Sequence, residues 1–361
     1  MSDRQISISF SNILLIVAVV LGLILLWQLQ SLIVILMISV VIAASLSPLV
    51  NWAEKMQVPR WLGVICVYLT LIATLTGVGL LIGPTIIHQI QNLVSKLPIF
   101  LEQLSDLMVS IASRLGEEPP QLIDQLFDIQ SVSKWLIRSS QELVLRSYGI
   151  TKGFLGGFFN LVLALFISGY LVVDSQTLIK SVVQLFPKPW DEKLAKQAVP
   201  VGNRMGGYIR GRLLVSGILG LAITASLSLL GMPEFSLGLG AIAGVTNLIP
   251  FIGPVLGSIP ALIVAVAKGG WIFLWVLVLF VIIQNVETYI LDPLLVGSSV
   301  GVHPLYQLLS VLAGIQLLGI IGAIIIPPWF AGASALVENL YLKPKLLAER
   351  KATKLAQKSV T

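Results

Sequence analysis

The residue types best suited to chemistry lie in one apolar stretch, VIIQNVETYILDP, at residues 281–293. Glu287 is accompanied there by Gln284 and Thr288, and the three share one face of a helix because they are spaced i, i+3 and i+4. A carboxylate is expensive to bury in lipid, so this face predicts a site for a cation, a proton or a hydroxylated solute. The alternative is a solvated glutamate near the end of a span. Asp292 lies nearer a loop, which favours this solvated alternative more strongly for it.

Other polar candidates lie on either side of this stretch. His303 precedes Pro304 and can titrate near neutral pH, although a lone loop histidine is more often structural. Gln307 lies in the last apolar region, either as a ligand or as one half of an interhelical hydrogen bond. Arg210 and Arg212 open an apolar span, and this position favours cytoplasmic anchoring for both.

The segment from Leu237 to Lys268 is apolar and longer than the ~20 residues that cross a bilayer, but prolines and glycines interrupt it. The interrupting residues are Pro250, Gly253, Pro254, Gly257 and Pro260. Proline removes a backbone donor, and groups freed in lipid must be satisfied by neighbouring helices or a cavity. The segment therefore predicts a broken membrane helix that lines a solute pathway, with the Asn247 amide beside it. A kinked structural helix is the alternative. A second proline break is expected at 327–328.

Composition places these segments in a membrane protein. Of the 361 residues, 56% are hydrophobic and 11% are charged, whereas a soluble domain carries ~25% charged residues. We expect about eight spans, at 12–27, 32–50, 61–83, 154–173, 209–230, 237–268, 272–291 and 305–337. The expected regions are an N-terminal three-span region (1–84), an amphipathic helical insert (85–151), a C-terminal five-span transport region (152–340) and a basic cytoplasmic tail (341–361). The insert is interpreted as surface-lying or oligomer-facing helices, or as a solvated spacer.

The distribution of charge predicts the orientation. The formal net charge is +6, which need not indicate nucleic acid because Lys and Arg gather in the cytoplasmic loops of membrane proteins. The loops at 51–60 and 174–208 and the tail carry the clearest Lys/Arg excess, whereas the turns at 28–31 and 231–235 contain neither residue. We therefore expect both termini in the cytoplasm, the insert outside, and the protein in the cell membrane.

Motifs of ATP-driven pumps and zinc enzymes are not found in the sequence. It contains no G-x-x-x-x-G-K and no H-E-x-x-H, and two histidines with one cysteine make a zinc cluster an unsuitable interpretation. No paired catalytic set stands out. The chain is therefore expected to have no enzymatic activity and no cofactor, which leaves a secondary transporter or a channel.

Several short motifs follow one another over most of residues 200–330. They are YIRG (208–211), NLIPFIGPVLGSIP (247–260), Q-x-x-E (284–287), PLLVG (293–297), VHPL (302–305), AG (313–314) and G-x-x-GA (319–323). In this order and spacing they resemble the AI-2E transporter family, also described as autoinducer-2 exporter-like permeases. Thr288 and Phe251 depart from the resemblance, since the family commonly has Asn and Tyr at these two positions.

The resemblance implies a multispan exporter or exchanger that does not hydrolyse ATP. Some members of the family are associated with export of the furanone signal autoinducer-2. Others are associated with exchange of sodium or lithium for protons. Homo-oligomeric assembly, with the insert as a contact, would fit the same family.

We therefore expect an all-α, polytopic membrane protein that acts as a secondary transporter. Its expected action is export of a small polar solute, such as an autoinducer-type signal, coupled to protons or sodium. The alternative is a monovalent cation/proton antiporter, and a third hypothesis is a non-transporting membrane scaffold. The expected partners are the solute, the coupling ion, the lipid bilayer and further copies of the chain, without nucleic acid. The expected pathway residues are Asn247, Pro250, Gly253, Pro254, Pro260, Gln284, Glu287, Thr288, Pro293, His303, Pro304 and Gln307.

Overall fold

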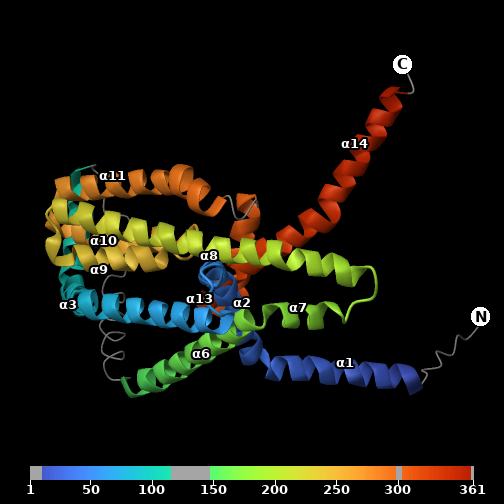
Figure 1. Cartoon of the computed structure of the whole chain (residues 1–361). Coiled ribbons are helices and arrows are strands. Elements are labelled where there is room, and N and C mark those ends of the chain that lie inside the picture. The colour runs from blue at the N-terminus through green and yellow to red at the C-terminus, as the bar shows by residue number, and fades with distance from the viewer. Residues whose placement is uncertain (1–9, 115–146, 298–302, 359–361) are drawn as a thin grey trace, which may run out of the picture.

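The computed structural model describes residues 10–114, 147–297 and 303–358, and each element assigned within these ranges is a helix (Figure 1). This confirms the expected all-α class. The α-helices are α1 (Phe10–Gln28), α2 (Gln30–Lys55), α3 (Arg60–Arg114), α6 (Ser147–Val173), α7 (Ser175–Val183), α8 (Trp190–Leu229), α9 (Pro233–Thr246), α10 (Ile252–Lys268), α11 (Gly270–Val286), α13 (Pro304–Val337) and α14 (Lys343–Lys358). Two π-helices, η1 (Glu287–Gly297) and η2 (Glu338–Leu342), continue α11 and α13.

Five helices in the described ranges are long and apolar enough to cross a membrane. The number becomes six if α6 and α7, which meet at an angle of 84°, form one span. The expected number of about eight is therefore not confirmed. One reason is that the predicted span 237–268 is divided into α9 and α10, which have 14 and 17 residues and are shorter than the ~20 residues of a typical span.

The helix that contains the third predicted span, 61–83, does not end at Pro84. Helix α3 passes through Pro84 and Pro98 and has 55 residues in all. Its length is about 80 Å at ~1.5 Å per residue. Membrane helices tolerate proline where neighbouring groups satisfy the freed backbone. The first part of the predicted insert is therefore helical, while its middle, 115–146, lies outside the described residues.

The predicted broken span at 237–268 is a hairpin rather than one interrupted helix. A Cβ built on Gly253 would lie 2.0 Å from the carbonyl oxygen of Thr246, and one built on Gly257 would lie 2.8 Å from the Cα of Ala243. These pairs run in opposite directions along the two helices, so α9 and α10 are antiparallel. The chain reverses at residues 247–251, where Phe251 has a φ of 64°. The structure divides the segment into two helices that lie side by side.

The second break was predicted at Pro327–Pro328, but in the structure it lies at Gly319. Gly319 has φ 64° and ψ −147° inside α13, a conformation that glycine adopts readily because it has no Cβ. The chain folds back there, since a Cβ on Gly314 would lie 2.3 Å from the carbonyl oxygen of Gly322. Pro327 and Pro328 are buried within the second arm of this helix.

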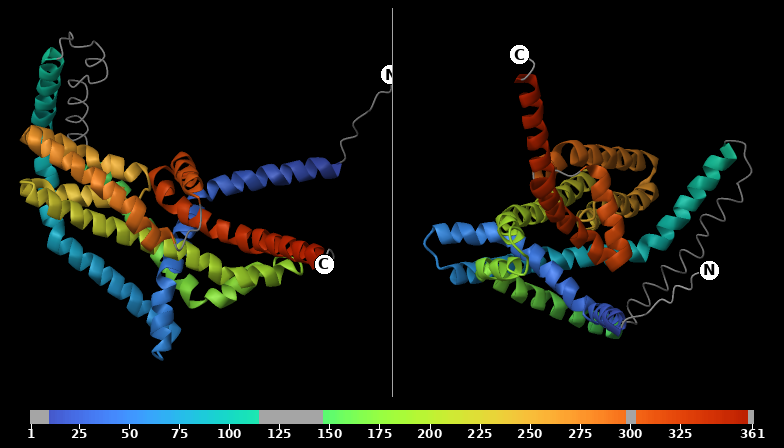
Figure 2. Two further views of the ribbon diagram at one scale, coloured as in Figure 1. Left: turned by 90° about the horizontal axis from the view of Figure 1, so that it is seen from above. Right: turned by 90° about the vertical axis from the view of Figure 1, so that its right-hand side faces the viewer.

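Helix α8 has contacts with several other elements. It contacts α9, α13, α2 and η1 and runs lengthwise through the molecule (Figures 1 and 2). Its glycines allow backbones to approach closely, as is common between membrane helices. A Cβ on Gly206 would lie 2.1 Å from the carbonyl oxygen of Ala44 in α2, and one on Gly211 would lie 2.2 Å from that of Leu295 in η1. Two segments distant in sequence are thereby held against one helix.

We expect Gly206→Ala to destabilise the protein, because the added methyl group would overlap the backbone of α2. The expected loss is about 1–3 kcal/mol, measured by thermal unfolding of the purified protein in detergent. Gly217→Ala is the matched control, since a Cβ on Gly217 of the same helix meets nothing within 4 Å. Equal stability of the two variants would contradict the close packing of α8 on α2.

Candidate functional site

The centre of the molecule holds a buried arginine that two carboxylates and an amide contact. Arg212 of α8 is 2% exposed, and its Nη1 lies 3.0 Å from Oε1 of Glu287 and 3.2 Å from Oδ1 of Asp292. Its Nη2 donates to Oδ1 of Asn247 at 3.1 Å. Asn247 follows α9 at the turn of the hairpin, and both carboxylates belong to η1. Three separate segments therefore meet on one guanidinium.

The balance of charge in this cluster is unequal. Arg212 supplies one positive charge, whereas ionised Glu287 and Asp292 together supply two negative charges. Glu287 is 3% exposed, and the Asp292 side chain is 34% exposed. Burying ions costs several kcal/mol each unless partners and hydrogen bonds compensate. With both carboxylates ionised, the cluster would therefore hold one surplus negative charge, which a proton or a monovalent cation can neutralise.

The π-helix η1 explains how Glu287 and Asp292 reach the same arginine. In an α-helix of 3.6 residues per turn, residues five apart point about 140° away from each other. The wider turn of a π-helix closes i→i+5 hydrogen bonds and brings such residues to one side. Pro293 lies inside η1, and its missing N–H and its ring disfavour regular α-helix at this point.

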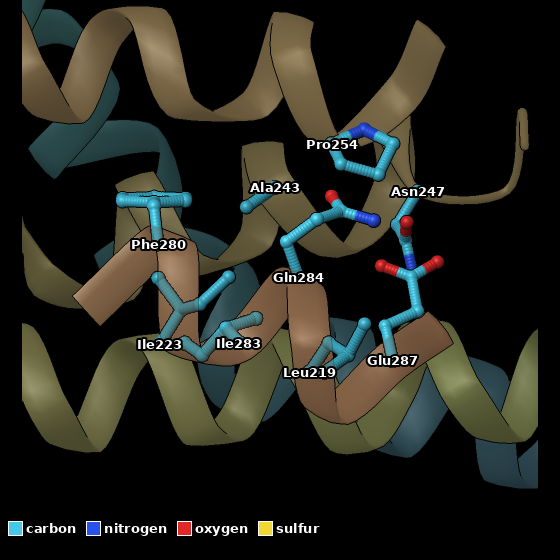
Figure 3. A pocket seen from close by; sticks show the side chains of 9 residues that line it. All are labelled: Leu219, Ile223, Ala243, Asn247, Pro254, Phe280, Ile283, Gln284 and Glu287. Atoms are coloured by element: carbon cyan, nitrogen blue, oxygen red, sulfur yellow. The ribbon is translucent and has the colours of Figure 1, made fainter. Parts of the chain in front are cut away.

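A narrow cavity lies beside Glu287. It is lined by the polar residues Asn247, Gln284 and Glu287, by Pro254, and by apolar side chains of α8, α9 and α11. Figure 3 shows the Glu287 carboxylate and the Asn247 side chain directed toward one another, with the Gln284 amide next to Pro254. The volume of the cavity is about 20 Å³, which is room for about one water molecule.

Tyr208 links the cluster to α13. It lies one helical turn before Arg212 on α8, is 2% exposed, and its hydroxyl accepts a hydrogen bond from Nε2 of Gln307 at 3.5 Å. Gln307 is therefore an interhelical contact in the structure. The first arm of α13 is thus connected to the face of α8 that carries the arginine.

Comparison with known proteins identifies the family of this chain. The model of the AI-2E family transporters matches residues 14–342, which is most of the chain. The chain belongs to the AI-2E transporter family. It is therefore an integral membrane permease, as the helices of membrane-spanning length also indicate.

Three relatives of this chain carry different names. "Putative transport protein YrrI" of Bacillus subtilis is 31% identical over 301 residues, which cover 81% of this chain and 82% of that protein. "Putative transport protein YueF" of the same organism is 26% identical, and the match covers 83% of this chain and 82% of that protein. A "Sodium-lithium/proton antiporter" of Halobacillus andaensis is 23% identical, and the match covers 81% of this chain and 85% of that protein.

The structure brings four of the expected pathway residues of this AI-2E permease to the cavity. They are Asn247, Pro254, Gln284 and Glu287. Pro250 lies in the reversal, and Gly253 lies in the first turn of α10. Gln284 donates to Thr288 at 3.3 Å, and both side chains are exposed.

The remaining expected pathway residues lie away from the cavity lining. Pro260 lies within α10 and Pro293 within η1. His303 caps α13, because its Nδ1 accepts a hydrogen bond from the backbone N–H of Leu305 at 3.2 Å, and Pro304 is the first residue of that helix. A role of these residues in transport stays a prediction.

Two central residues were assigned other roles from the sequence. Arg212 was expected to anchor the chain in the cytoplasm, which is wrong, because it is buried at the centre of the cluster. The spacing of residues could have predicted the burial of Arg212, because it shares one face of α8 with the buried residues Tyr208, Val215 and Leu219. Asp292 was expected to lie nearer a loop, and the π-helix instead brings it to Arg212 together with Glu287.

We expect Arg212→Gln to lower the free energy of unfolding by about 3–5 kcal/mol, because it leaves two carboxylates without their buried counter-charge. Denaturation in detergent measures the loss. The matched test repeats the substitution in a Glu287→Gln/Asp292→Asn background, where it should cost much less. Equal losses in the two backgrounds would show that the three side chains act independently.

Proposed function

We propose that this AI-2E permease is an ion-coupled secondary transporter, and that Arg212, Glu287 and Asp292 form its coupling centre. The observation that carries the proposal is the contact of two carboxylates with one buried guanidinium. Neutralisation of the surplus charge by a proton or a monovalent cation changes the electrostatic energy of the cluster. This change couples ion binding to the arrangement of α8, η1 and the α9–α10 turn. Intramembrane ionisable groups of this kind are typical of ion and substrate pathways.

The proposed cargo is a small polar solute, with an autoinducer-type signal as a candidate for export. Three buried polar atoms, Nε of Arg212, Nδ2 of Asn247 and Oγ of Ser216, have no hydrogen-bond partner among the described residues, and Asn247 lines the cavity. Buried polar groups generally find partners, so hydroxyl or carbonyl oxygens of a solute, or water, would complete them. A solute larger than water requires the cavity to widen from the volume seen here.

We expect Glu287→Gln to abolish stimulation of solute flux by an ion gradient, because the neutral amide no longer exchanges a proton or cation with the cluster. Flux is measured in proteoliposomes against a panel of small polar solutes that includes autoinducer-2, with and without pH and sodium gradients. Glu234→Gln is the control, since Glu234 is an exposed partner of Lys96 at 3.7 Å. Gradient-dependent flux that survives in Glu287→Gln would overturn the role of Glu287.

A second candidate function is a monovalent cation/proton antiporter. The cavity beside Glu287 has room for a water-sized species, and a relative of 23% identity is named a sodium-lithium/proton antiporter. If this function holds, a sodium gradient alone should move protons across proteoliposomes without any organic solute, and Asp292→Asn should stop that movement. Absence of sodium-driven proton movement in the unaltered protein would exclude this candidate.

We also propose that both termini lie in the cytoplasm of the cell membrane and that the chain forms homo-oligomers. The start of α1 and the end of α14 lie toward the same end of the molecule (Figure 1), and the predicted positive-inside loops support the cytoplasmic assignment. A reporter fused to the tail and chemical cross-linking in membranes check these two points.

A further inference from the structure

Helix α14 extends away from the rest of the molecule and is strongly basic. It carries six Lys or Arg residues and one acidic residue, Glu349, and it follows the membrane-length helix α13 through η2. Figures 1 and 2 show it projecting from the bundle, and η2 is the element with which it makes its principal contacts in the described part of the chain. Its sides are therefore open to an external partner.

The described side chains of α14 combine charge with apolar surface. Lys345, Arg350 and Lys351 are exposed, while Leu346 and Leu347 are 45% and 59% exposed. Lys345 reaches Glu349 only at 3.9 Å. Long basic side chains next to exposed leucines are typical of helices that lie at the boundary between lipid headgroups and acyl chains.

The base of α14 is fixed to the transport region. Glu338 at the start of η2 forms ion pairs with Arg204 of α8 and, at 3.1 Å, with Lys343. Asn339 also donates to Oε1 of Gln197 on α8 at 2.8 Å. Whatever binds α14 therefore acts close to the helix that carries Arg212.

We propose that α14 binds the anionic phospholipid headgroups of the membrane surface next to which it emerges. A cluster of four to eight Lys or Arg residues beside a membrane span is attracted to anionic lipids. Because the other helices are embedded in the bilayer, lipid headgroups are present near α14 at high effective concentration. This favours lipid over a soluble acidic protein or nucleic acid as its partner. At ~1.5 Å per residue α14 is about 24 Å long, enough to bring several basic residues to the surface at once. The proposal does not depend on the transported solute.

The test places a fluorescent label on α14 of the full-length protein. Cys66 is the single cysteine, so Cys66→Ser with Thr353→Cys gives one labelling position on an exposed side chain. The protein is reconstituted into vesicles of phosphatidylcholine alone or of phosphatidylcholine with phosphatidylglycerol. Quenching by acrylamide, which is neutral and water-soluble, should fall markedly in the anionic vesicles. Salt near 1 M, where the Debye length is ~3 Å, should restore quenching.

Two variants separate charge from structure. Lys345→Gln/Arg350→Gln/Lys351→Gln should lose the difference between the two lipid compositions, whereas Lys345→Arg/Lys351→Arg, which keeps the charge, should retain it. Size-exclusion chromatography verifies that each protein is folded. Equal quenching in both vesicle types would overturn the proposal. Protection by an added oligonucleotide or acidic peptide, without any effect of anionic lipid, would assign α14 to a different partner and would also overturn it.

Discussion

The burial of the Arg212 charge is the constraint on which the rest of the structure depends. A guanidinium that is 2% exposed must find counter-charges and acceptors within the protein, because the lipid offers none. Glu287, Asp292 and Asn247 meet this requirement from η1 and the α9–α10 turn. The π-helix and the hairpin are therefore needed electrostatically as well as sterically, and any rearrangement during transport must keep this arginine compensated.

Close packing on α8 makes these contacts possible. Backbones approach at Gly206 and Gly211 so closely that a Cβ would lie within about 2 Å of a carbonyl oxygen, and van der Waals packing of this kind is a principal attraction between helices in lipid. Gly211 holds η1 directly beside Arg212, and α9 of the hairpin packs along the same helix. In this AI-2E permease, the irregular backbone of η1 thus lies against the long α-helix α8.

The sequence predicts the class and the neighbourhood of the site, but not its centre. Composition and span-length apolar runs predict an all-helical membrane protein, and Asn247, Gln284 and Glu287 do line one cavity. The positions of the chain reversals are harder to predict from the sequence, because Gly319 rather than Pro327–Pro328 turns the chain. Arg212 was misassigned because positively charged residues at span ends usually face the cytoplasm. The approach of Asp292 to Glu287 depends on a π-helix, which α-helical periodicity does not predict.

The central claim is that the cluster holds one surplus negative charge that a proton or a sodium ion neutralises. Proton uptake by the purified protein, titrated with and without sodium, tests this directly. The account predicts that the unaltered protein takes up about one proton per chain more than Asp292→Asn over the titration, and that sodium shifts this uptake to lower pH. Identical uptake by both proteins, with no effect of sodium, would contradict the account.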